Sequence, residues 1–153
     1  MLNFNQFNML TEKDYCDYDI CVALKELGYK IPTSAYYMPK NSQLIFVINQ
    51  FRGGVAMDCF YSNNSLPKEC MASDFIDAPT MWEVQKWLRE EKNIEVNASF
   101  DKKDDGWIGF IQRLDYPDLY GTDVFSTVYN TYESALLVSI KEAIEILKEE
   151  NND

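Results

Sequence analysis

The chain contains no histidine among its 153 residues, and this absence removes several common kinds of catalytic site. Ser–His and Cys–His nucleophile pairs are excluded, as are metal sites built on imidazole. The phosphate-binding patterns GxGxxG and GxxxxGK[ST] are also absent, and the adjacent Gly53 and Gly54 predict only a turn. Carboxylates, tyrosines and lysines stay available as acids and bases. A histidine-independent enzyme that uses carboxylates is therefore kept as one alternative, although no recognisable pair of acids supports it.

Paired cysteines and long apolar runs are missing as well. Cys16, Cys21, Cys59 and Cys70 form no CxxC pair, so they predict reduced, partly buried thiols and no zinc site. No run approaches the roughly 18 apolar residues that a membrane span requires. The first residues, MLNFNQFNMLTEKDY, lack the apolar block of a secretory signal. We therefore expect a cytoplasmic protein with no cofactor, no metal and no membrane contact.

Basic residues are few relative to acidic ones. Fourteen Lys and Arg face twenty-five Asp and Glu, which gives a formal net charge of −11. Such a surface repels phosphate backbones, so direct binding to nucleic acid is disfavoured. It suits a basic protein as partner, or imitates nucleic acid in front of a protein that binds nucleic acid. The alternative is that it is simply the surface of a soluble acidic protein with no such role.

Apolar residues, in contrast, are plentiful. Hydrophobic residues make up 46% of the chain and aromatics 14%, which is enough for an ordered core. The length fits one domain over residues 1–153, or two small halves packed together.

The first half predicts one helix and three strands. The helix lies between Thr11 and Gly28, with Thr11 and Asp14 as a capping pair, unless Asp17 starts a shorter one. Gly28 is placed to end it in a left-handed turn. The strands are expected at residues 34–38, 44–48 and 55–61.

The second half predicts two helices around three further strands. Thr80 and Glu83 fit a capping box, and the helix that they begin should end near Glu91. A final helix should start at Asn130 or Thr131. Its apolar stripe is the clearest periodicity in the chain and consists of Leu136, Ile140, Ala143, Ile144 and Leu147.

The three strands between these helices are expected at residues 94–100, 107–114 and 124–129. Asp105 and Gly106 suit the hairpin turn between the first two, because Gly, and to a lesser extent Asp, tolerates a positive φ.

The two halves repeat one order of elements. With an offset of 63 residues, Ala35 corresponds to Ala98 and Tyr37 to Phe100, whereas the helices fit better at 64. The possible pseudo-repeat halves are residues 11–64 and 78–150. The sequence thus predicts an α+β fold of two similar helix–strand–strand(–strand) units. We expect a mainly antiparallel sheet with helices packed on one side and an extra C-terminal helix.

One loop is the leading candidate for a binding site. In DYPDLYG, the side chains of Tyr116, Leu119 and Tyr120 stand on an otherwise polar turn, and aromatics are enriched at the cores of protein interfaces. The alternative is that this loop packs onto its own sheet. Trp82, Trp87 and Trp107 are expected to be buried or half-buried anchors of the fold.

The run APTMWEVQKWLREEKNIEVNASF, with the later NTYESALLVSIKEAIEILKEE, resembles small uncharacterised proteins of gut Bacteroides and of their phages and integrated mobile elements. The shared patterns are a PT-x-x-x-x-x-x-WLRE helix start and a YE-x-AL…I-x-EAI ending. The likeness covers residues 78–150 well and the first half loosely. That group has no established activity, so the resemblance implies an origin and no chemistry.

A second, local resemblance is to the partial ribonuclease-H-like domain of HicB-type antitoxins, where a hairpin leads to a PDL-x-G turn and a helix that opens on EAL. Pro117-Asp118-Leu119 and Gly121 match the turn. Glu133, Ala135 and Leu136 match the helix start with one inserted serine, and the appended DNA-binding domain of many such antitoxins has no counterpart here. The resemblance implies an inhibitor of the antitoxin kind.

The favoured function is that of a non-enzymatic accessory protein from a phage or mobile element, which acts by binding an as yet unknown protein. The alternatives are an acidic inhibitor that mimics nucleic acid or resembles an antitoxin, and a carboxylate enzyme. Self-association through an exposed sheet edge is also left open.

Overall fold

The computed structural model describes residues 11–31, 33, 35–38, 42–52, 55–60, 75–115, 122–124 and 127–151. Its contacts divide the chain into two compact units. The first, here called the N-terminal unit, is Asp17–Pro79. The second, the C-terminal unit, combines Met1–Cys16 with Thr80–Asp153.

The N-terminal unit contains one helix and an antiparallel sheet. Its elements are α1 (Tyr18–Glu26), β1 (Ala35–Tyr37), β2 (Leu44–Arg52), β3 (Val55–Phe60) and β4 (Ile76–Asp77). The strand order is β3-β2-β1-β4, so the short β4 pairs with β1 and not with its neighbour in sequence. The three predicted strands are present with shifted ends, whereas β4 lies between the predicted strand 55–61 and the helix that begins at Thr80, where the sequence predicts no strand.

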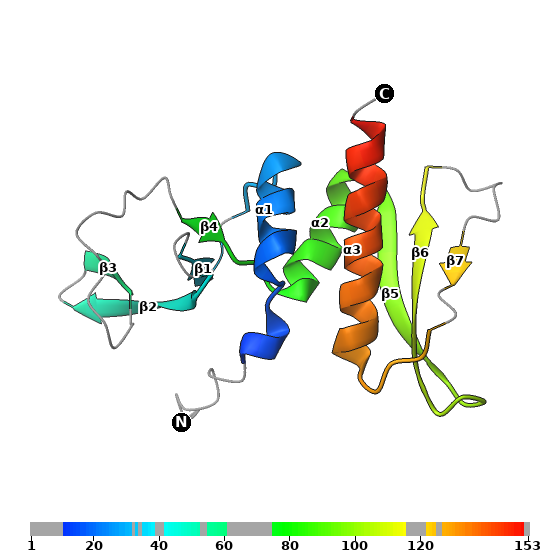
Figure 1. Cartoon of the computed structure of the whole chain (residues 1–153). Coiled ribbons are helices and arrows are strands. Elements are labelled where there is room, and N and C mark those ends of the chain that lie inside the picture. The colour runs from blue at the N-terminus through cyan, green and yellow to red at the C-terminus, as the bar shows by residue number, and fades with distance from the viewer. Residues whose placement is uncertain are drawn as a thin grey trace. The chain divides into compact units, whose positions relative to one another are not determined.

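The C-terminal unit packs two long helices against one side of a sheet (Figure 1). Its elements are the 3-10 helix η2 (Glu12–Asp14), α2 (Met81–Glu91), β5 (Ile94–Asp101), β6 (Gly106–Arg113), β7 (Thr122–Val124) and α3 (Tyr132–Glu150). The sheet is antiparallel in the order β5-β6-β7. α3 contacts β5 and β6, while α2 contacts β5 and α3, so both helices cover one face. The predicted α+β class and the extra C-terminal helix are confirmed.

The predicted first helix is divided in two. In η2 the carboxylate of Asp14 accepts hydrogen bonds from the backbone N–H and the hydroxyl of Thr11, as the capping pair predicted. Tyr15 then becomes extended and forms a β-bridge with Thr80, which ends this helical turn. α1 begins after Asp17, so the shorter of the two predicted helices is the one that forms.

The end of α1 is set by Gly28, as predicted. This residue has φ +85°, a conformation that a side chain would oppose. Its N–H donates to the carbonyl of Lys25 over 3.2 Å, and the N–H of Tyr29 donates to the carbonyl of Leu24 over 2.9 Å. These two bonds are those of a Schellman motif.

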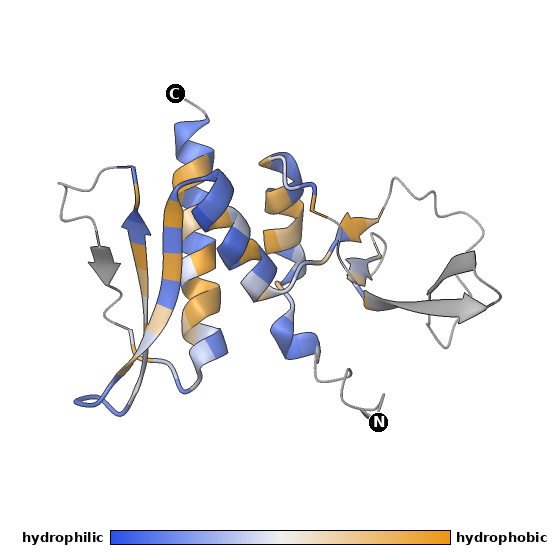
Figure 2. Ribbon diagram, turned by 180° about the vertical axis from the view of Figure 1, so that it is seen from behind, coloured by the Kyte–Doolittle hydropathy of each residue, from blue (hydrophilic) through white to orange (hydrophobic). Residues whose placement is uncertain are grey.

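The core of the C-terminal unit lies between the sheet and the two helices. The predicted stripe of α3 is buried throughout, and β5 buries Ile94, Val96 and Ala98 against it. Figure 2 shows these apolar positions along α3 and β5. Of the three tryptophans expected to be buried or half-buried, Trp87 is buried and Trp107 is half-buried. The expectation is wrong for Trp82, which is 41% exposed, because the neighbouring Met81 is buried in its place.

Side-chain caps begin both helices of this unit where the sequence predicted them. Thr80 accepts a hydrogen bond from the N–H of Glu83, whose carboxylate accepts the N–H of Thr80 over 2.7 Å. In the same way the hydroxyl of Thr131 accepts the N–H of Ser134 over 3.1 Å. These caps satisfy helix N–H groups that have no partner within the helix.

The repeat is visible in the strand register. In the N-terminal unit Ala35 pairs with Phe46, and in the C-terminal unit Ala98 pairs with Gly109, so both partners are displaced by the same 63 residues. The next pairing, β2 with β3, corresponds to β6 with β7 when the third strand is displaced by 64. The two units therefore share element order and hairpin register.

The third strand of the C-terminal unit is shorter and earlier than predicted. The expected strand 124–129 is replaced by β7, and Tyr129 forms only an isolated bridge with Trp107. The hairpin turn is also built differently from the prediction. Asp105 takes the positive φ of 51°, whereas Gly106 does not have one. Gly106 is needed for space, because an added Cβ would lie 2.3 Å from Cγ1 of Val128.

The substitution Gly106→Ala should therefore destabilise the protein by about 1–3 kcal/mol, the usual cost of overpacking. The double variant Gly106→Ala/Val128→Ala should recover part of that loss, because the closest atom is then removed. Urea unfolding of the four proteins measures both effects. If the losses of unfolding free energy in the two single variants simply add in the double variant, Val128 does not restrict the space at Gly106.

Candidate functional site

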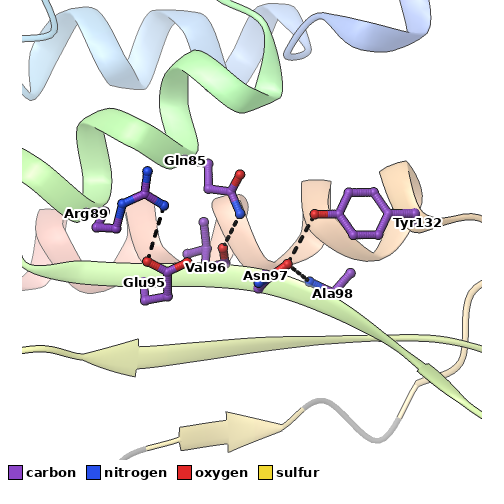
Figure 3. A network of polar contacts seen from close by, with 7 residues as sticks. All are labelled: Gln85, Arg89, Glu95, Val96, Asn97, Ala98 and Tyr132. Carbon is purple, nitrogen blue, oxygen red and sulfur yellow. Dashed lines mark hydrogen bonds and ion pairs between the residues drawn. The ribbon is translucent and has the colours of Figure 1, made fainter.

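The outer edge of β5, meaning the side that does not pair with β6, is partly covered by side chains from the helices (Figure 3). From α2, the amide of Gln85 donates to the carbonyl of Val96 over 2.7 Å. One turn later Arg89 reaches Glu95 with an N–O distance of 3.5 Å. An uncovered sheet edge would offer these backbone groups to another chain.

Asn97 continues this cover toward the end of the strand. Its side-chain oxygen accepts the hydroxyl of Tyr132 over 3.1 Å and the N–H of Ala98 over 2.9 Å (Figure 3). Ser139 of α3 donates to the carbonyl of Asn97 over 3.1 Å, but this carbonyl is on the β6 side of the strand, so the bond attaches α3 to the sheet and is not part of the edge cover. The cover thus reaches the N–H of Ala98, and within the described ranges nothing bonds to the outer edge beyond it.

The direction of the remaining backbone groups follows from the pairing of β6. Trp107 exchanges two hydrogen bonds with Tyr129, at 2.8 and 2.7 Å, so its backbone groups point away from β5. Phe100 lies directly opposite Trp107 in the register. The two residues therefore form a non-hydrogen-bonded antiparallel pair, in which the backbone N–H and C=O groups of both residues point away from the partner strand. The N–H and C=O of Phe100 therefore lie on the outer edge of β5.

Three aromatic side chains meet at this same end of the sheet, and we call them the aromatic surface. The rings of Phe100 and Trp107 are 5.5 Å apart and those of Trp107 and Tyr132 are 5.2 Å apart, both in edge-to-face geometry. Trp107 and Tyr132 are half-buried, but Phe100 is 45% exposed. Edge-to-face packing is a favourable arrangement of aromatic rings, so these pairs favour the positions in which the three rings are found.

Charged residues flank the aromatic surface at the hairpin tip. Lys102, Lys103, Asp104 and Asp105 are exposed, and Asp101 accepts the backbone N–H of Lys103 over 2.8 Å. With three acids and two lysines, the tip retains the negative sign of the whole chain. A basic partner would therefore meet no net repulsion there.

Two titratable groups of the N-terminal unit have a raised pKa. Burial raises the pKa of the Cys21 thiol well above its usual range, and Asp17 and Asp77 add to that effect. A thiol that stays protonated is a poor nucleophile. Burial also raises the pKa of Asp77, against the opposing charge of Lys25. The described ranges hold no group of three or more Cys, Asp or Glu side chains placed to bind a metal ion.

Tyr116, Leu119 and Tyr120, the predicted contact loop, lie outside the described residues. Phe100 was not among the predicted site residues, and Trp107 was predicted only as an anchor of the fold. The available signal was the hairpin turn itself, since a turn over residues 102–105 places Phe100 opposite Trp107. Two facing aromatics near a hairpin tip could have been read from the sequence.

Comparison with known proteins gives no assignment, because no family model, no curated protein and no solved structure matches the chain. Among the helices that the structure describes, none is long and apolar enough to cross a membrane.

We expect the substitution Tyr132→Phe to lower the free energy of unfolding by about 0.5–1.5 kcal/mol, because it removes the hydrogen bond to Asn97 and keeps the ring. Tyr129→Phe is the matched control, since the described part of the chain provides no partner for that hydroxyl. Urea unfolding of both variants checks this. Equal losses in both would mean that the bond to Asn97 contributes nothing to the cover of β5.

Proposed function

We propose that this protein is a non-enzymatic accessory protein that acts by binding another protein, with the aromatic surface as its contact site. The observation that supports this most directly is the exposure of Phe100 beside the half-buried ring of Trp107. When a partner covers a large aromatic side chain that is exposed to water, the free energy falls, and this favours binding. Binding energy in protein interfaces is concentrated in such residues.

The charge of the chain indicates the kind of partner. A protein of net charge −11 attracts a basic surface and repels an acidic one. The resemblance to proteins of Bacteroides phages and mobile elements supports an accessory role, in which a small cytoplasmic protein acts on a protein of its host or element.

A second candidate function is inhibition of a nucleic-acid-binding protein by charge mimicry, in the manner of an antitoxin-like inhibitor. The same net charge favours it. The two functions differ in their dependence on salt. Interactions between exposed charges are screened over about 10 Å at 0.1 M salt, whereas burial of aromatic rings is not weakened by salt.

Phe100→Ala should reduce capture of the partner from a Bacteroides-type lysate by at least about tenfold, as expected for loss of a central aromatic contact. Trp82→Ala is the matched control, because Trp82 is similarly exposed, at 41% against 45%, and lies on α2 of the same unit. Retained protein is quantified by mass spectrometry after washing, and circular dichroism confirms that both variants fold. Equal capture by both variants would remove the aromatic surface as the contact site.

The same capture at low and high salt separates the two functions. A partner that Phe100→Ala releases and high salt does not supports binding through the aromatic surface. A nucleic-acid-binding protein that high salt releases from every variant alike would instead support charge mimicry.

A further inference from the structure

The two units share a hairpin register but differ at one edge. In the N-terminal unit, the outer edge of β1 is occupied by β4, which pairs antiparallel with it. Tyr37 lies opposite Ile76, and the N–H of Ala78 donates to the carbonyl of Ala35 over 2.9 Å. β1 thus already accepts an added strand that is only a few residues long.

Among the residues that the structure describes, no strand is added to the corresponding edge in the C-terminal unit. The offset of 63 residues places Ala98 at the position of Ala35 and Phe100 at that of Tyr37. β5 is the end strand of its sheet, and within the described ranges β6 is its only partner. The carbonyl of Ala98 and both backbone groups of Phe100 therefore occupy the positions that β4 satisfies in the other unit.

Side chains at the edge with an added strand are more buried than the corresponding side chain at the edge without one. Tyr37 is 9% exposed where β4 lies beside β1, and Ile76 of β4 is itself 9% exposed. Phe100, at the corresponding position without an added strand, is 45% exposed. The ring of Tyr18 in α1 also contacts Tyr37, with 5.6 Å between the ring centroids, so the added strand accounts for only a part of this difference.

We propose that the outer edge of β5, from Ala98 to Phe100, binds an extended segment of a basic partner protein as an added antiparallel strand, in the register that β4 takes on β1. This inference rests on the proposed function and specifies how the partner is held. Strand addition supplies affinity through backbone hydrogen bonds and specificity through alternate side chains. The cover provided by Gln85 and Asn97 confines the open edge to these few residues.

The neighbours of the open edge define the chemistry of the bound segment. One of its residues takes the place of Ile76 and must be apolar, because it lies beside Phe100 as Ile76 lies beside Tyr37. The residue before it, at the position of Phe75, points to the opposite face and lies across from Asp101, which favours a lysine or arginine there. A second copy of this chain suits the edge less well, because each copy carries a charge of −11.

The test uses the full-length protein and synthetic peptides derived from the chain's own added strand. The lysine peptide spans residues 73–79 with Phe75→Lys and Asp77→Lys, which places one lysine opposite Asp101 and the other opposite Ser99 in the proposed register. The aspartate peptide has Phe75→Asp and keeps Asp77. The N-methyl peptide is the lysine peptide with a methyl group on the amide nitrogen of Ala78. That nitrogen is the donor to Ala35 in the N-terminal unit, so the methyl group removes one defined hydrogen bond.

We expect the lysine peptide to bind with a Kd on the order of 0.1–1 mM and to shift the NMR amide signals of Ser99, Phe100 and Asp101. The N-methyl peptide should bind about tenfold more weakly, because a hydrogen bond is lost and the methyl group collides with the edge. The aspartate peptide should also bind more weakly. Equal binding of the lysine and aspartate peptides would overturn the basic character of the partner.

Variants of Phe100 separate the backbone from the side chain. Phe100→Pro removes the outward N–H but no bond to β6, whereas Phe100→Ala keeps that N–H and removes the ring. Both substitutions should weaken the binding of the lysine peptide. If Phe100→Pro does not fold, the N-methyl peptide alone tests the backbone bond.

The results distinguish this inference from the function on which it rests. If the N-methyl peptide binds as well as the lysine peptide, strand addition is wrong, and a loss with Phe100→Ala alone would still support the aromatic surface. No binding of the lysine peptide at about 1 mM also overturns strand addition. If the free protein sediments as a dimer that Phe100→Pro dissociates, the edge belongs to a second copy and the partner assignment fails.

Discussion

The backbone hydrogen-bonding groups at the edge of a sheet cannot be paired within that sheet, and much of this structure follows from how they are treated. In the C-terminal unit, α2 and α3 cover one face and also send polar side chains around the first half of β5. In the N-terminal unit, a two-residue strand serves the equivalent purpose for β1. Each solution satisfies groups that would otherwise pair with another chain.

The cover of β5 depends on residues whose other roles are already set by the fold. Gln85 and Arg89 lie one helical turn apart on α2, so they reach neighbouring positions of one strand. Tyr132 opens α3 and also contacts Trp107, which ties the helix start to the hairpin. A change at any of these residues would alter both the packing of a helix and the access to the edge.

Most of the fold could be predicted from local patterns. The caps at Thr80 and Thr131 and the apolar stripe of α3 are formed by residues that lie within a few positions of one another. The repeat was also readable, because corresponding residues of the two hairpins keep one offset.

The elements that escaped prediction depend on distant parts of the chain. β4 has two residues and no periodicity of its own, so its existence depends on the edge of β1. The early end of η2 depends on the bridge from Tyr15 to Thr80. Phe100 is exposed because, in the described ranges, no strand pairs with the outer edge of β5 beside it. Such an absence leaves no local pattern in the sequence.

The pairing order of the two sheets also has a consequence for how the chain folds. In the C-terminal unit, β5, β6 and β7 pair in the order of synthesis, so each contact closes only a short loop. In the N-terminal unit, β4 must return to β1, where Tyr36 pairs with Asp77. Closing that longer loop costs more entropy and slows folding. The pairing of β4 with β1 should thus form last in that unit. Until it forms, the outer edge of β1 has no paired strand and resembles the outer edge of β5.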